Sequence, residues 1–161
     1  MHSFVESNQG DSVLAVGRRA AAAVDSAGRA QVALYVLHRG NTLFQEAQQT
    51  KARADYEKAL PYPFLADTLA GGPGDTRNQA HLLIGASHLM MGWNLLTEAH
   101  RDRSCVKARQ AVRDLEVATN TLPEGSAKHH ARGGTLFHML AESSESAARL
   151  AADLCAKGKR D

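Results

Sequence analysis

A stripe of small and large apolar residues occurs twice in this chain and constrains its fold more than any other feature. The first copy consists of Ala52, Tyr56 and Ala59, and the second of Ala111, Leu115 and Ala118. Steps of four and three residues place the side chains of each copy on one side of an α-helix, because one turn takes 3.6 residues. A proline follows each copy, at Pro61 and Pro123, and should end the helix. The pattern therefore predicts a repeated helical hairpin, and such repeats usually form binding surfaces.

The composition favours helices and argues against several other classes of protein. The chain has 161 residues, enough for one domain, and 43% of them are hydrophobic while only 5% are aromatic. A core rich in alanine and leucine suits closely packed helices, so we expect an all-α fold without strands. The net charge of +2 comes from basic residues that do not cluster, so nucleic-acid binding is not expected. No stretch approaches the roughly 18 apolar residues of a membrane span.

Apolar periodicity and capping residues divide the first half of the chain into helices over about residues 11–26, 29–48 and 50–60. Thr50 is expected to cap the third of these helices. Residues 61–64 contain two prolines, so we expect them to be extended or turned, with a short helical turn at 65–69. The glycines within residues 71–75 predict a loop.

In the second half, residues 76–101 form one long apolar pattern, which predicts a helix with partners on two sides. Ser104 is positioned to cap the next helix, and Gly133 and Gly134 predict a break before the last one. We expect a single domain over residues 1–161. Its predicted parts are a hairpin at about 29–60, the loop at 71–75, a second hairpin at about 76–123 and a capping helix at about 135–156.

The first copy of the stripe, together with the residues before it, resembles a tetratricopeptide repeat (TPR). The residues that carry the resemblance are Val36, Gly40, Ala52, Tyr56 and Ala59, with Pro61 or Pro63 behind them. Arg39 departs from the pattern, because a large apolar residue is usual there. In the second copy the candidate glycines, Gly85 and Gly92, lie further upstream, so its hairpin is about two helical turns longer. The resemblance implies antiparallel helical hairpins, stacked as a short, irregular TPR-like array with a C-terminal capping helix.

The same resemblance implies a non-catalytic protein- or peptide-binding module that needs no cofactor. In TPR proteins the first helix of each hairpin lines the binding face. On the matching helix, Asn41 and Gln45 lie beside Phe44, and their amides are suited to hydrogen-bonding a partner's backbone. His88 and Asn94 are the corresponding candidates on the long helix. The alternative for each is ordinary solvated helix surface, and a homo-oligomer is compatible with either interpretation.

Cys105 and Cys155 stand near the start of one predicted helix and near the end of another. If these helices are antiparallel neighbours, the two side chains meet and form a disulfide; otherwise they are free thiols of a cytoplasmic protein. Their spacing fits no zinc or redox motif. The disulfide is the favoured interpretation, and with it an extracytoplasmic location, periplasmic or secreted. The arrangement around these cysteines also resembles that of small secreted bacterial proteins with helical repeats, although residues 1–8 lack the features of a signal peptide.

Two other function classes stay open. Arg132 and His138 resemble the Arg-x(4–6)-His pattern of the helical ribonucleases called HEPN domains, although Gly133 and Gly134 depart from that family's pattern. In that family the pair acts on RNA phosphates. The other class is a helical bundle that binds a small molecule in a cavity near Trp93. The eight histidines show no metal-binding motif such as HExxH, so no metal is expected.

Overall fold

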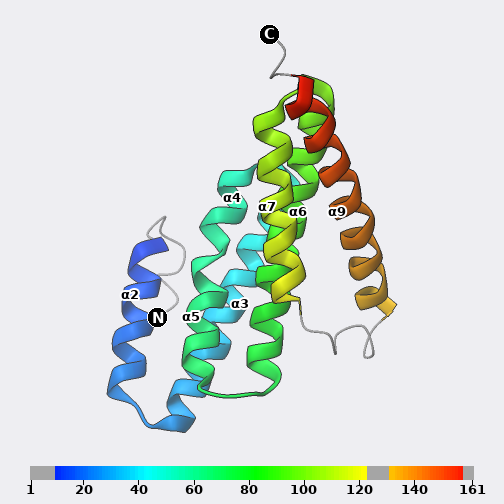
Figure 1. The fold of residues 1–161 in the computed structure, drawn as a ribbon. Helices are drawn as coiled ribbons and strands as arrows, with labels where there is room; N and C mark the ends of the chain where they lie inside the picture. The colour runs from blue at the N-terminus through cyan, green and yellow to red at the C-terminus, as the bar shows by residue number, and fades with distance from the viewer. Residues whose placement is uncertain (1–9, 123–130, 158–161) are drawn as a thin grey trace. The chain divides into compact units, whose positions relative to one another are not determined.

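The structure, a computed structural model, describes residues 10–122 and 131–157, and side chains within 14–122 and 136–156 (Figure 1). The described residues form α-helices joined by turns, and no strand occurs among them. The all-α prediction is therefore confirmed. Contacts divide the chain into two compact units, Met1–Leu83 and Ile84–Asp161, with the boundary inside helix α6. The single-domain organisation stays a prediction.

Unit 1 contains four complete helices and the first part of a fifth: α2 (Gly10–Ala23), α3 (Ser26–Thr50), α4 (Arg53–Ala59), α5 (Pro61–Ala70) and α6 (Asp75–Asp102). Asp25 caps α3, because its Oδ1 accepts a hydrogen bond of 2.8 Å from the backbone N–H of Gly28. Thr50 is the last residue of α3 and not the cap of α4. Its Oγ1 accepts from the backbone N–H of Ala52 at 3.2 Å and donates to Oδ2 of Asp55 at 2.7 Å. These bonds order the turn between α3 and α4.

The buried side of α3 packs against α4 and α5 (Figure 1). Gly40 marks a close approach, because a Cβ at this position would lie 2.8 Å from Cβ of Tyr62 and 3.1 Å from Cδ of Pro63. Tyr56, a residue of the first stripe, is fully buried, and so is Ala59. Ala52, the first residue of that stripe, is instead the exposed N-cap of α4. The first copy of the stripe therefore contributes two of its three residues to the core.

Residues 61–64 are helical, so the prediction of an extended or turned segment is wrong. Helix α5 begins at Pro61, and Pro63 also falls within its first turn. A proline there costs the helix little, because the first four N–H groups of a helix have no partner inside it. At its other end α5 stops at Gly71, whose φ of 69° is left-handed and therefore suits glycine. Gly71 opens the predicted loop before α6.

Unit 2 contains the rest of α6, α7 (Cys105–Thr121) and α9 (Ala131–Lys157). Helix α6 confirms the prediction of one long helix. Arg103, with a φ of 54°, turns the chain between α6 and α7. The Oγ of Ser104 then accepts a hydrogen bond of 3.3 Å from the backbone N–H of Lys107, which confirms the predicted cap.

The second copy of the stripe packs α7 closely against α6. Ala111, Leu115 and Ala118 are all buried. A Cβ at Gly92 would lie 2.8 Å from Cγ of Leu115 and 3.2 Å from the carbonyl oxygen of Ala111, so only a glycine allows this approach without a shift. Gly85 makes the same kind of contact with Leu122. Pro123, expected behind this stripe, lies outside the described residues.

Helix α9 runs without interruption from Ala131 and contacts α7 (Figure 1). Gly133 and Gly134 lie inside it, so the predicted break is wrong. Two glycines cost a helix about 2 kcal/mol relative to alanine. Four side chains that α9 buries further along offset this cost: Leu140, Ala147, Leu150 and Leu154. The TPR-like arrangement of these helices stays a prediction.

Candidate functional site

Helix α3 exposes a row of side chains beside its buried face. We call Leu34, His38, Asn41 and Gln45 the α3 stripe, because steps of four and three residues align them along the helix. All four are exposed, Leu34 by 51%. Tyr35, next to the stripe, is 44% exposed. The stripe therefore offers an apolar group at one end and two side-chain amides towards the other.

Two of the three binding residues predicted on this helix lie on the stripe. Within the described residues, the side-chain amides of Asn41 and Gln45 have no hydrogen-bond partner. Phe44, the third, is only 7% exposed and packs edge-to-face against Tyr56, with ring centroids 5.8 Å apart. It belongs to the buried face of α3 because it aligns with Gly40 there. Phe44 therefore holds the helix in place and leaves contact with a partner to its neighbours.

The two candidates on α6 belong to unit 2 and do not form a similar surface. The side chain of His88 is largely buried, and its Nδ1 lies 3.4 Å from Oδ1 of Asp114, a buried residue of α7. Asn94 is partly exposed and interacts with another group of the chain. No sequence pattern indicates the His88–Asp114 contact, because one aspartate within a helix does not show which residue faces it. This pair links α6 to α7.

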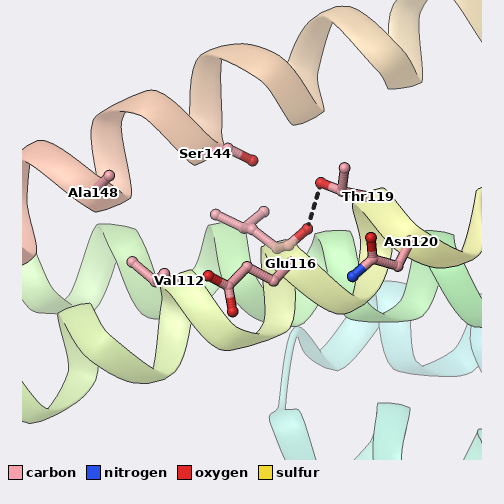
Figure 2. Close-up of a pocket in the computed structure, with 7 residues that line it drawn as sticks. Val112, Glu116, Thr119, Asn120, Ser144 and Ala148 are labelled. Atoms are coloured by element: carbon pink, nitrogen blue, oxygen red, sulfur yellow. Dashed lines mark hydrogen bonds between the residues drawn. The ribbon is translucent and has the colours of Figure 1, made fainter.

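A pocket of about 230 Å³ lies between α7 and α9 (Figure 2). Its lining residues are Val112, Leu115, Glu116, Thr119, Asn120, Ser144 and Ala148. The Oγ1 of Thr119 donates a hydrogen bond of 2.8 Å to the carbonyl oxygen of Leu115. The Oγ of Ser144 is shielded from solvent and has no hydrogen-bond partner among the described residues. Trp93, near which the sequence suggested a ligand cavity, does not line this pocket.

The turn between α6 and α7 carries a cluster of exposed and partly exposed charges. Asp102 accepts a hydrogen bond of 2.8 Å from Nε of Arg101 and one of 2.6 Å from Nζ of Lys107. These bonds, that of Arg101 first, lower the pKa of Asp102 to about 2. Lys107 also donates to Oε2 of Glu98 at 2.7 Å. The cluster joins the end of α6 to the start of α7, a structural role.

Cys105 and Cys155 lie at disulfide-bonding distance, with their Sγ atoms 2.03 Å and their Cα atoms 5.1 Å apart. Cys105 is the first residue of α7 and Cys155 lies near the end of α9. The two helices are therefore antiparallel neighbours, which is the arrangement that the predicted pairing required. A disulfide at this place fits an oxidising, extracytoplasmic compartment.

Of the HEPN-like pair Arg132 and His138, the structure describes only the side chain of His138. His138 is exposed on α9, and its Nε2 lies 3.2 Å from Oε1 of Glu142 one turn along the helix. The side chain of Arg132 lies outside the described residues, so the HEPN-like pair stays a prediction. Among the side chains that the structure describes, no three His, Cys, Asp or Glu residues are grouped so that they could hold a metal ion.

None of the helices in the described part of the chain is long and apolar enough to cross a membrane. Comparisons of the chain with protein-family models, with curated proteins and with solved structures find no match.

Proposed function

We propose that this chain is a non-catalytic protein- or peptide-binding module of the TPR-like type, whose partner lies along the α3 stripe. The observation that carries the proposal is that Asn41 and Gln45 are exposed one turn apart without hydrogen-bond partners among the described residues. A side-chain amide offers both donors and an acceptor, which are the groups that an extended peptide backbone requires. Leu34 and Tyr35 add apolar contact area at the other end.

The packing of α3 supports this proposal, because a rigid surface loses less entropy on binding than a mobile one. Helix α3 spans 25 residues, is capped by Asp25, and buries a continuous face against α4 and α5. The close approach at Gly40 fixes its position relative to α5. The side chains of the stripe therefore project from a backbone that is already in place before a partner arrives.

A peptide-display selection against the folded protein tests the proposal. A selected peptide is then titrated calorimetrically into the wild type and into Asn41→Ala, Gln45→Ala and Leu34→Ala. Loss of one hydrogen bond should weaken binding about 2- to 10-fold. Gln79→Ala, which removes an exposed glutamine from α6, is the matched control and should bind like the wild type.

Two results would count against the proposal, and they differ in meaning. Selection that enriches no peptide contradicts the binding function itself. A peptide that binds all three α3 variants as tightly as the wild type contradicts the assigned surface. Circular dichroism of each variant shows whether the helices are retained, because all three substitutions are at exposed positions and should leave the fold intact.

A further inference from the structure

We propose that the pocket between α7 and α9 binds a primary alkylammonium group. The pocket belongs to unit 2, whereas the α3 stripe belongs to unit 1, so binding at one site can fail without affecting the other. The inference rests on the charge of Glu116, on the number of unpartnered acceptors around it, and on the apolar wall beside them.

Glu116 gives the pocket a negative charge that its neighbours do not neutralise. Among the described residues, its carboxylate forms no ion pair and no hydrogen bond. Arg113, one turn earlier on α7, donates its hydrogen bond to the side chain of Gln110 instead. A cation in the pocket would therefore meet an available carboxylate, whereas an anion would be repelled.

The pocket also presents two further acceptors, Oδ1 of Asn120 and Oγ of Ser144. The amide of Asn120 has no partner within the described residues, and neither has the hydroxyl of Ser144. Figure 2 shows Ser144 on α9, across the pocket from Glu116 and Asn120 on α7. Ser144 belongs to the lining of the pocket, and its Oγ is shielded from solvent. An ammonium group has three N–H donors and no acceptor, so it matches one carboxylate, one amide oxygen and one hydroxyl.

The remaining wall favours an aliphatic chain of limited length behind the ammonium group. Val112, Leu115 and Ala148 supply apolar surface. The volume of about 230 Å³ is smaller than the roughly 300–1,000 Å³ of pockets that hold drug-sized ligands. The occupant that fits both properties is a short alkylamine, or the side chain of a lysine, which has the same stem and head group.

Titrations of the ¹⁵N-labelled full chain, followed by amide chemical shifts, test the inference with n-pentylamine and pentan-1-ol. The two compounds have nearly the same size, but only the amine is charged at pH 7. We expect n-pentylamine to shift the amides of residues 112–120 and 144–148 and to saturate, and pentan-1-ol to bind more weakly. Equal binding of the alcohol, or no saturating shift with the amine, overturns the proposal.

Variants separate the contributions of charge and space. Glu116→Gln should weaken n-pentylamine binding about fivefold, while Glu145→Gln, an exposed α9 carboxylate outside the pocket, should leave it unchanged. Ala148→Leu adds bulk at an exposed residue of the wall and should abolish binding without disturbing the fold. Unchanged affinity in Glu116→Gln or Ala148→Leu contradicts the assigned site. A titration with an Nα-acetylated lysine amide distinguishes a partner's lysine from a free alkylamine as the ligand. If this compound binds as n-pentylamine does, the pocket accepts the lysine side chain of a partner. If only n-pentylamine binds, the ligand is a free amine.

Discussion

Removing the cross-link between Cys105 and Cys155 should lower the free energy of unfolding by about 4 kcal/mol. The two cysteines are 50 positions apart. In the chain-entropy model, closing a loop of this length removes about 14 cal/mol/K from the entropy of the unfolded chain, which corresponds to about 4 kcal/mol at 25 °C. Because the cross-link joins α7 to α9, the loss of stability should be largest in these two helices.

Urea unfolding followed by circular dichroism measures this loss. With a slope of about 2 kcal/mol/M, a loss of 4 kcal/mol moves the midpoint by about 2 M. The double variant Cys105→Ala/Cys155→Ala serves as the control, because it should unfold like the reduced wild type and should not respond to reductant. Hydrogen exchange should show reduced protection of the α7 and α9 amides in both samples.

Two results would contradict a stabilising cross-link between Cys105 and Cys155. Titration of the folded, unreduced protein with a thiol reagent should detect no free thiol, so two free thiols show that no cross-link exists. A reductant that leaves the urea midpoint unchanged shows that the cross-link does not stabilise the fold. If only the double variant is destabilised, the loss comes from the packing of the cysteine side chains.

Three further predictions concern single residues. Gly92→Ala should destabilise unit 2, because the new Cβ would lie 2.8 Å from a buried leucine side chain. Gly72→Ala, whose Cβ meets nothing within 4 Å, should instead stabilise the protein by about 0.4–1 kcal/mol. Urea unfolding should therefore give changes of opposite sign in the free energy of unfolding, and changes of the same sign contradict the helix contact. Tyr56→Phe should stabilise by up to about 1 kcal/mol, because the Tyr56 hydroxyl is buried without a partner among the described residues. Burial raises the pKa of Tyr56 above its ordinary value of 10.0. The free energy of unfolding of the wild type therefore keeps its full value below pH 10 and falls above it. Alkaline unfolding should show this loss, and the loss should be smaller in Tyr56→Phe. Asp102, with a pKa of about 2 against an ordinary 3.8, stabilises the fold above pH 4 and loses this effect as the pH falls towards 2. Thermal unfolding of Asp102→Asn should therefore be less sensitive to acid over that range. An acid profile equal to that of the wild type contradicts a stabilising role of the Asp102 carboxylate.

Much of the helical structure could be predicted from the sequence, because its signals are local. Ser104 caps α7 and Gly71 ends α5 as their residue types indicate. The prediction of an extended or turned segment over residues 61–64 was wrong, and so was that of a break at Gly133 and Gly134, because neither considered where in a helix these residues lie. Pro61 and Pro63 lie in the first turn of α5, where a missing N–H costs little. Gly133 lies within a helix whose later residues pack against α7.

The candidate sites were less predictable because they depend on how helices pair. Phe44 follows Asn41 by three residues, but the rotation of α3 against its neighbours buries the phenylalanine and exposes the amide. The pocket requires Glu116 of α7 and Ser144 of α9 to lie on either side of it, and no pattern in either helix specifies that register. The close approach at Gly92 also depends on how α6 and α7 pair, and the sequence alone placed this glycine only as a candidate glycine of the second hairpin.

Whether the α3 stripe is a binding surface can be measured by an NMR titration of the ¹⁵N-labelled chain with a selected peptide. We expect chemical-shift changes to concentrate at the amides of Leu34, His38, Asn41 and Gln45, with saturation at the affinity measured by calorimetry. Saturating changes in which these four amides do not move would contradict this expectation.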